Sequence, residues 1–122
     1  MSDCIFCKII AREIPAQVVY EDDVALAFRD IHPAAPVHVL LVPKKHIVTL
    51  SDCDATEAAM LGHLLGLVPQ IAKKTGCDVT RVDGVMGGGY KTVINTGPNG
   101  GQEVHHLHIH VLGGDRPWRG FK

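Results

Sequence analysis

The sequence has almost no excess of one charge, with twelve Lys and Arg residues against thirteen Asp and Glu and a net charge of -1. Nucleic acids and anionic membranes are bound by basic surfaces, so this balance argues against both as main partners. No segment approaches the roughly 18 apolar residues needed to cross a bilayer. Any phosphate group must therefore be bound by a few well-placed residues, which favours a small ligand.

A secretion signal is also missing, because the first residues have neither a basic start nor a long apolar run. The four cysteines are Cys4, Cys7, Cys53 and Cys77. In a chain without an export signal, they are more typical of thiols or metal ligands than of a disulfide framework. We therefore expect a cytoplasmic protein.

No repeat, low-complexity tract or linker divides the 122 residues, so we expect one domain over residues 1–122. An apolar segment at 5–11 predicts one or two helical turns. A capping box at Asp54 and Glu57, followed by an apolar stripe, predicts one long helix that Pro69 should kink or split. No structure is predicted for the loop from Cys77 to Gly89.

Short β-rich runs account for most of the remaining chain. Strands are predicted at 18–20, 24–28, 37–42, 92–95 and 106–112. The last two are joined by a glycine-rich segment containing Asn99-Gly100, which is typical of a hairpin. Short links favour antiparallel neighbours. The sequence thus predicts an α+β domain with about five antiparallel strands, one short N-terminal helix and one long helix.

The run from His106 to His110 alternates histidine with aliphatic residues. In a strand, His106, His108 and His110 would project from one face, roughly 6.5–7 Å apart, and Leu107 and Ile109 from the other. Three interpretations compete: solvent-facing strand residues, a metal site with Glu103 as the nearest further ligand, and catalysis on phosphorus.

We favour catalysis on phosphorus, because neutral imidazole can attack at physiological pH and a second imidazole can protonate the leaving group. The preceding turn, Gly100-Gly101-Gln102, supports this interpretation. Its backbone N–H groups and the Gln102 amide are neutral donors suited to an anion.

Segments along nearly the whole chain resemble the histidine triad family, and specifically its Hint branch. The signature is the alternating run from His106 to Leu112, followed by two glycines. Further segments similar to Hint proteins, in the same order, are 4–10, 13–15, 20–23, 27–31, 43–47 and 100–104.

Hint proteins are homodimers that cleave adenosine phosphoramidates to AMP and an amine through a nucleotidyl-histidine intermediate. The resemblance implies that His108 is the nucleophile and that His110 contacts phosphate and assists the leaving group. It implies that His106 orients His108 through its backbone, with His38 behind it as a hydrogen-bond partner. No cofactor is implied for catalysis.

The resemblance also implies a binding site for a purine nucleotide. Asp30 would accept hydrogen bonds from the ribose. The apolar slot for the purine would consist of Phe6, Ile9, Phe28 and Ile31. The phosphate side would be lined by Asn95, Gly101, Gln102, Glu103 and Val104. On pattern alone, the apolar four would be core residues, Asp30 a turn residue and His38 a core histidine.

Two features leave specificity open. Many Hint proteins carry a small hydroxyl residue where this chain has Glu103, whose carboxylate is unfavourable beside phosphate unless it turns away. In relatives, the tail corresponding to 115–122, which here contains Trp118, reaches toward the partner's active site.

Cys4 and Cys7 have the spacing of zinc ligands, but a zinc site needs four ligands. His46 and His106 could complete the set, as in some triad-family proteins, although His106 would then serve both metal and catalytic scaffold. The alternative is two ordinary, partly buried thiols.

Two other functions compete with the phosphoramidase. The first is a dinucleoside polyphosphate hydrolase of the same family, whose members usually carry glutamine in place of the last triad histidine. The second is a nucleotide- or zinc-binding regulator that hardly turns over. The presence of His110 favours the phosphoramidase over the first, and the correctly spaced nucleophile argues against the second.

Overall fold

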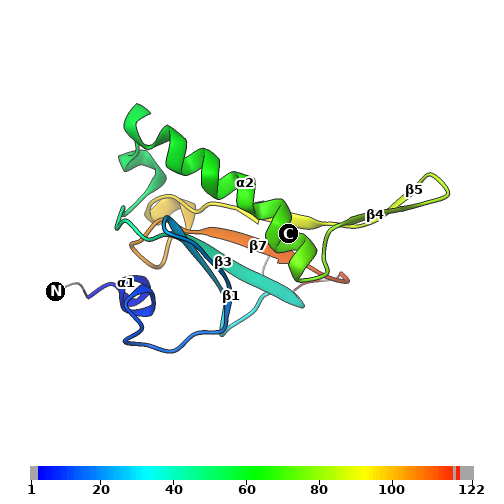
Figure 1. The fold of residues 1–122 in the computed structure, drawn as a ribbon, viewed down its shortest axis with the longest axis horizontal. Helices are drawn as coiled ribbons and strands as arrows, with labels where there is room; N and C mark the ends of the chain where they lie inside the picture. The colour runs from blue at the N-terminus through cyan, green and yellow to red at the C-terminus, as the bar shows by residue number, and fades with distance from the viewer. Residues whose placement is uncertain (1–2, 117, 119–122) are drawn as a thin grey trace.

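The structure is a computed structural model that describes residues 3–116 and 118. Its centre is a five-stranded antiparallel sheet with strand order β1-β2-β3-β7-β6 (Figure 1). These strands are β1 (Val18–Glu21), β2 (Ala25–Arg29), β3 (Val37–Pro43), β6 (Tyr90–Val93) and β7 (Ile109–Gly113). The predicted α+β architecture is confirmed.

Two helices accompany the sheet, α1 (Ile5–Ile10) and α2 (Ala58–Lys74), and α2 lies along one face of it (Figure 1). The predicted capping box at Asp54 and Glu57 is present, although it caps a short 3-10 turn that directly precedes α2. Pro69 does not split the helix, which continues to Lys74. Pro69 has no backbone N–H, so the carbonyl of Leu65 lacks its usual helical donor. Both residues are exposed, so water can donate to that carbonyl instead.

Alternation along the central strands gives the sheet two buried faces. In β3, Val39 and Leu41 belong to the core under α2, whereas Leu40 and Val42 pack in a second core that contains α1. Strand β7 follows the same pattern, with Ile109 and Val111 under α2. The even-numbered residues of β3 and β7, including the histidines, therefore face the α1 side of the sheet.

The boundaries of the last strands differ from the prediction. Strand β6 ends at Val93 and β7 begins at Ile109, so His106 and His108 lie in the irregular segment before the strand. The two strands do pair, with Val93 opposite His110. Their connection is not a tight Asn-Gly hairpin but a longer loop that contains a 3-10 turn at Pro98–Gly100.

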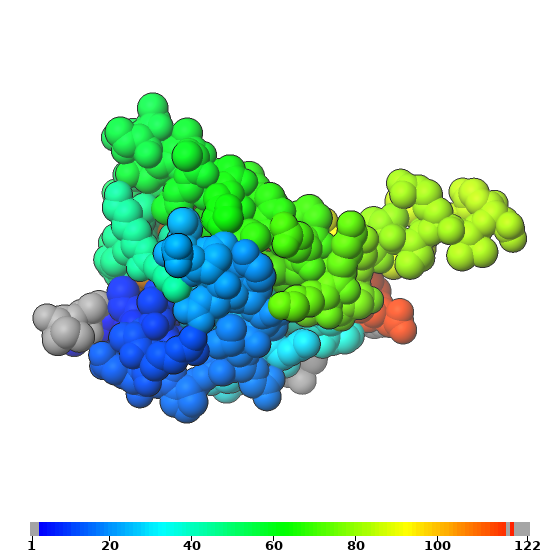
Figure 2. Space-filling view, viewed as in Figure 1, coloured from blue at the N-terminus to red at the C-terminus, as the bar shows by residue number. Residues whose placement is uncertain are grey.

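The segment left unassigned forms a two-stranded ribbon, β4 (Val79–Val82) and β5 (Val85–Gly88). Asp83 and Gly84 both adopt positive φ in its turn, the conformation that a two-residue hairpin requires. Every residue of both strands is exposed, and the ribbon stands clear of the body as an arm (Figure 2). No helix in residues 3–116 is long and apolar enough to span a membrane.

Candidate active site

The predicted nucleophile, His108, is buried and held in one tautomer. Its Nδ1 lies 2.7 Å from the backbone oxygen of His106. A carbonyl only accepts, so Nδ1 carries the proton and Nε2 carries the lone pair. Burial lowers the pKa of His108, outweighing the opposite effect of this hydrogen bond. His108 is therefore a neutral imidazole with its nucleophilic nitrogen defined by the backbone.

The partner of His38 is His110, because the strand register places them diagonally on one face of the sheet. Leu40 is paired with His110, and His38 with Leu112. His38 Nε2 lies 2.9 Å from His110 Nδ1. The prediction that His38 stands behind His106 is therefore wrong, because the pairing of β3 with β7 directs it to the last histidine of the run.

Directed hydrogen bonds determine the protonation of this pair. The backbone N–H of Ala34 donates to His38 Nδ1 at 3.1 Å, so the proton of neutral His38 resides on Nε2 and is donated to His110 Nδ1. His110 then carries its own proton on Nε2. Burial, reinforced by His108 and His38, lowers the pKa of His110 to about 4. At neutral pH, His110 is a neutral donor beside the nucleophile, with a distance of 4.9 Å between the two ring centroids.

A cavity of about 510 Å³ lies in front of these histidines on the α1 side of the sheet. The four residues predicted to contact a purine all line it, namely Phe6, Ile9, Phe28 and Ile31. The edge of the Phe6 ring contacts the rings of His108 and Phe28, with centroids 5.1 and 5.5 Å away. Ile31 is 82 % exposed, whereas the other three are under 10 % exposed. The cavity is an apolar slot whose open rim includes Ile31.

Asp30 lies at the polar end of the slot, where the prediction requires a ribose acceptor. Its Oδ1 accepts from the backbone N–H of His32 at 2.8 Å, which is an Asx turn. Its Oδ2 lies 3.5 Å from His38 Nε2. The carboxylate is therefore held in place, and it retains acceptor capacity for a ligand hydroxyl.

The glycine-rich loop does not supply the donors that the sequence indicates. The amides of Gly100, Gly101 and Gln102 donate to carbonyls within their own turn. The Gln102 side chain is buried, donates to the carbonyls of Val48 and Val104 and accepts from the Gly97 amide. Gln102 therefore maintains the shape of the loop and does not line the cavity.

Other residues of this loop do line the cavity. They are Asn95, Gly101, Glu103 and Val104. The side-chain amide of Asn95, two residues after β6, donates to the carbonyl of Gly100 at 2.7 Å, which closes the loop and leaves the Asn95 side-chain oxygen as an acceptor. Within the described residues, the amides of Glu103 and Val104 make no hydrogen bond, so these are the backbone donors on this side of the site.

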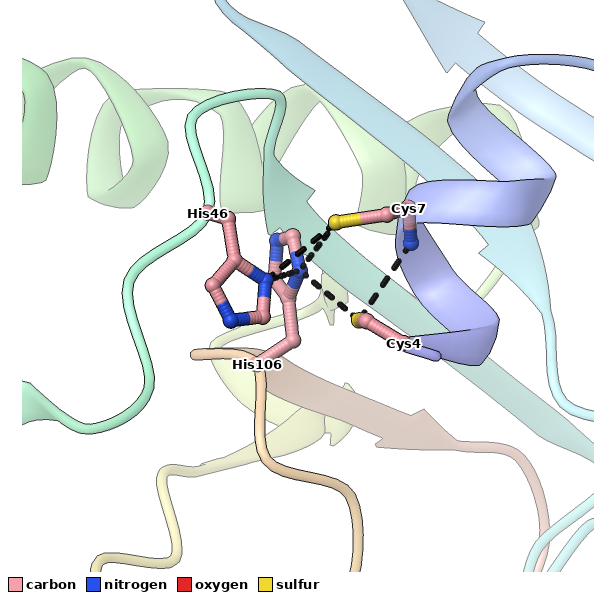
Figure 3. A group of neighbouring side chains, drawn as sticks. All are labelled: Cys4, Cys7, His46 and His106. Carbon is pink, nitrogen blue, oxygen red and sulfur yellow. Dashed lines mark hydrogen bonds between the residues drawn. The ribbon is translucent and has the colours of Figure 1, made fainter. Parts of the chain in front are cut away.

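Four candidate metal ligands meet beside the site: Cys4, Cys7, His46 and His106 (Figure 3). One Nδ1 or Sγ atom from each lies within 4.8 Å of the others. The distances to His106 Nδ1 are 3.3 Å from Cys4 Sγ and 3.1 Å from His46 Nδ1, and Cys7 Sγ lies 3.2 Å from His46 Nδ1. Tetrahedral zinc implies S···N separations of about 3.5 Å and N···N separations of about 3.3 Å. The cluster fits such an ion.

His106 can serve both as a metal ligand and as the residue that orients His108, because different groups of the residue perform the two roles. Its Nε2 donates to the carbonyl of Pro43 at 2.8 Å, which leaves the Nδ1 lone pair directed into the cluster. Its backbone oxygen is the group that orients His108.

A second group, Asp30, His38 and His110, also brings its ligand atoms within 4.8 Å of one another. Here the hydrogen bonds disfavour a metal. His38 Nδ1 already accepts from Ala34, so binding through Nε2 would require loss of both ring protons. These three residues are better suited to sharing a proton than to binding a metal ion.

Two contributions to the site escape sequence analysis because they come from the backbone. The Ala34 amide and the Pro43 carbonyl set the tautomers of His38 and His106, and any residue except proline could supply the first and any residue the second. Several residues that line the slot were not predicted, among them Ile14, Ala16 and Leu40; for Leu40, its even-numbered position in the buried strand was the available signal.

Comparison with known proteins agrees with this geometry. A model of the HIT domain family matches residues 11–117. The chain belongs to the HIT domain family. An uncharacterised HIT-like protein from Synechococcus elongatus is 56% identical over 112 residues, covering 92% of this chain and 90% of the relative. The purine nucleoside phosphoramidase of Escherichia coli K12 is 43% identical, covering 92% and 87%.

Solved structures show the same HIT domain fold. A HIT family hydrolase from Legionella pneumophila has a TM-score of 0.83 and 44% identity, covering 93% of this chain and 95% of its own. A histidine triad protein from Clostridium difficile has a TM-score of 0.83 and 44% identity, covering 96% and 95%. The resemblance inferred from the histidine run is confirmed at the level of the family.

Proposed function

We propose that this HIT domain hydrolyses purine nucleoside phosphoramidates, such as adenosine 5'-phosphoramidate or AMP joined to a lysine amine, to AMP and the amine. The observation that carries the proposal is the 2.7 Å hydrogen bond from His108 Nδ1 to the His106 carbonyl, at the end of an apolar slot. The E. coli relative named as a purine nucleoside phosphoramidase supports this substrate class.

Binding would place the purine between the apolar walls and the ribose hydroxyls on Asp30. His108 Nε2 then attacks the α-phosphorus, and the phosphorus–nitrogen bond breaks as the new one forms. The departing amine takes a proton through the hydrogen bond from His110 Nε2. Water next attacks the phosphorus of nucleotidyl-His108 and gives a proton to His110, and the phosphorus–Nε2 bond breaks to release AMP and restore His108.

Charge on the phosphoryl oxygens would be met by His110 and the loop amides of Glu103 and Val104. Among the described residues, no lysine lines the cavity, and Arg29, the one basic lining residue other than histidine, is exposed. Neutral donors dominate this end of the site, which leaves the phosphorus open to a neutral nucleophile.

The direct test is to trap the intermediate. A fast-reacting adenosine phosphoramidate is mixed with the protein and quenched in base, which preserves the acid-labile bond, and labelled peptides are mapped by mass spectrometry. We expect AMP on His108. A label on another residue would contradict the mechanism. Guanosine phosphoramidates and a diadenosine polyphosphate in the same assay separate this activity from that of a polyphosphate hydrolase, and binding without turnover would indicate a regulator.

We also propose that Cys4, Cys7, His46 and His106 hold one zinc ion. All four tetrahedral positions are taken by protein groups, which is typical of a structural rather than a catalytic site, so we expect catalysis itself to need no metal. Such a thiol site, with no disulfide among the four cysteines, suits a reducing compartment, and we propose a cytoplasmic location.

Metal analysis of the purified protein should find about one zinc per chain. Cys4→Ser should remove it and lower the melting temperature, because three segments lose their common ligand. Cys53→Ser is the matched control, since Cys53 lies outside the cluster. Zinc retained in full by Cys4→Ser would exclude this ligand set. Complete loss of turnover on chelation, reversed by zinc without refolding, would indicate a catalytic metal.

The protein should be a homodimer. The outer strands β1 and β6 leave two sheet edges open within the described chain, and the arm exposes Val82, Val85 and Met86. A two-fold partner is a common way to cover such surfaces. Light scattering at micromolar concentration should give about twice the 13.2 kDa chain mass. A stable monomer would contradict the expectation.

A monomer would also remove the proposed role of the tail in the partner's site. Within this chain, the indole N–H of Trp118 donates to the Gly114 carbonyl at 3.0 Å, and Arg116 lies over its ring. Residues 117 and 119–122 lie outside the described residues.

A further inference from the structure

His106 lies between the metal cluster and the nucleophile, and each of its polar groups has a separate partner. Ring Nδ1 faces Cys4, Cys7 and His46, ring Nε2 donates to Pro43, and the backbone carbonyl accepts from His108 Nδ1. His106 is fully buried, so no solvent lies between the metal cluster and His108 at this residue. A displacement of the His106 ring or backbone therefore changes the hydrogen bond that sets the tautomer of His108.

Hydrogen bonds within the cluster do not select a single partner for His106 Nδ1. The bond to Pro43 leaves a single lone pair on His106 Nδ1, and three groups converge on it: Cys4 Sγ at 3.3 Å, His46 Nδ1 at 3.1 Å and Cys7 Sγ at 3.6 Å. One lone pair accepts one well-directed hydrogen bond at a time. Without an ion, alternative pairings compete, whereas a tetrahedral ion engages all four ligands at once.

The four ligands also come from three separate parts of the chain. Cys4 caps the N-terminus of α1 and Cys7 lies in its first turn, His46 lies in the loop after β3, and His106 lies before β7 (Figure 3). The loop is tied to the last segment by the Leu107 amide, which donates to the Ile47 carbonyl at 2.7 Å. A metal ion bound here would join all three segments, because its ligands His46 and His106 are each adjacent in sequence to a residue of that hydrogen bond.

Helix α1 extends the coupling to the purine slot. Phe6 lies between the two cysteine ligands, and its ring edge meets both His106 and His108, with centroids 6.0 and 5.1 Å away. Ile9, one turn later, lines the same slot. Release of α1 from the cluster would therefore loosen a wall of the slot together with the carbonyl that orients the nucleophile.

We propose that Cys4, Cys7 and His46 are positioning residues for catalysis: by binding a metal together with His106, they hold the His106 carbonyl that keeps His108 in its Nδ1–H tautomer. The proposal rests on the phosphoramidase function only for its consequence in turnover. The tautomer of His108 can be measured without any substrate.

The primary experiment is long-range ¹H–¹⁵N NMR of the histidine side chains in the zinc-loaded full-length protein. We expect one set of signals for His108, with Nδ1 protonated and Nε2 unprotonated. The double variant Cys4→Ser/Cys7→Ser, with metal loss verified by metal analysis, should show His108 as a mixture of tautomers or as broadened signals. Cys53→Ser should keep the wild-type pattern.

A ligand swap separates metal binding from the thiols themselves. His46→Cys keeps four zinc ligands, and His46 is exposed, so the change is sterically mild. It should retain zinc and the His108 pattern. If the double variant does not fold, chelated wild-type protein with an unchanged circular dichroism spectrum replaces it in the same measurement.

Turnover supplies the second readout. Loss of outer groups that orient a site typically costs 10–100-fold, so kcat of the double variant should fall at least about tenfold, while the control Cys53→Ser stays within about threefold. An unchanged His108 tautomer in metal-free protein would overturn the proposal. A different outcome is that the tautomer changes on metal loss but neither the wild-type protein nor any variant cleaves a phosphoramidate. In that case the positioning role stands and the proposed function fails.

Discussion

Replacing His108 with alanine should lower kcat for an adenosine phosphoramidate by at least about three orders of magnitude, because the variant has no nucleophile at that position. His108 Nε2 is the one lone pair that the backbone directs toward the slot. His110 cannot substitute for it, because its own Nδ1 accepts from His38 and its Nε2 carries a proton. The measurement is single-turnover kinetics with a substrate that releases a chromogenic amine.

The matched control is His63→Ala. His63 lies on the exposed face of α2 and pairs with Asp22 at 2.6 Å, on the opposite side of the sheet from the slot. This variant should retain wild-type kcat. His108 is buried, so the folded content of both variants is compared by circular dichroism. Folded His108→Ala with turnover within tenfold of wild type would exclude the covalent mechanism.

Replacing His110 with alanine should lower kcat by about 10²–10⁴-fold for a substrate with an alkylamine leaving group, and by less than about tenfold for an electron-poor aromatic amine. The difference arises because an alkylamine leaves only with a proton, whereas an electron-poor amine tolerates the charge. A plot of log kcat against amine pKa, steeper in the variant than in wild type, is the expected result.

His38→Ala should reproduce part of this effect, because His38 directs the Nε2 proton of His110 through the 2.9 Å hydrogen bond. Equal losses for both leaving-group classes in His110→Ala would show that the histidine binds phosphate without assisting departure.

The pH profile follows from the same pair. Burial, with the neighbouring His108 and His38, lowers the pKa of His110 to about 4. Because the ring is neutral well above that value, its donor state does not change between about pH 6 and 8. Protonation of His110 at lower pH places a second proton on Nδ1, opposed to the proton of His38 Nε2. The contribution of His110 to kcat should therefore stay constant across neutral pH and decrease on the acid side.

Local patterns in the sequence were sufficient to predict the fold class and the surroundings of the histidine run. The alternation of residues 106–112 predicted that the histidines and the intervening aliphatic residues lie on opposite faces; Ile109 and Val111 do pack in the core under α2, although β7 begins only at Ile109. The capping box at Asp54 was also predicted, because it depends on residues within a few positions of one another.

The resemblance also named several residues that line the slot, among them Phe6, Phe28 and Asp30. It did not determine the direction of the hydrogen bonds among them. Gln102 was expected on the phosphate side, but its side-chain amide donates to the carbonyls of Val48 and Val104, and Gln102 does not line the cavity.

Only the tertiary structure decided the partner of His38 and the compatibility of the two tasks of His106. Both depend on strand register and on which backbone carbonyl or amide meets each ring nitrogen, and these are contacts between segments up to about 100 residues apart. A period-two pattern specifies the face on which a side chain lies. The neighbour that it meets there is set by the pairing of β3 with β7 and by the seating of α1, which no local pattern encodes.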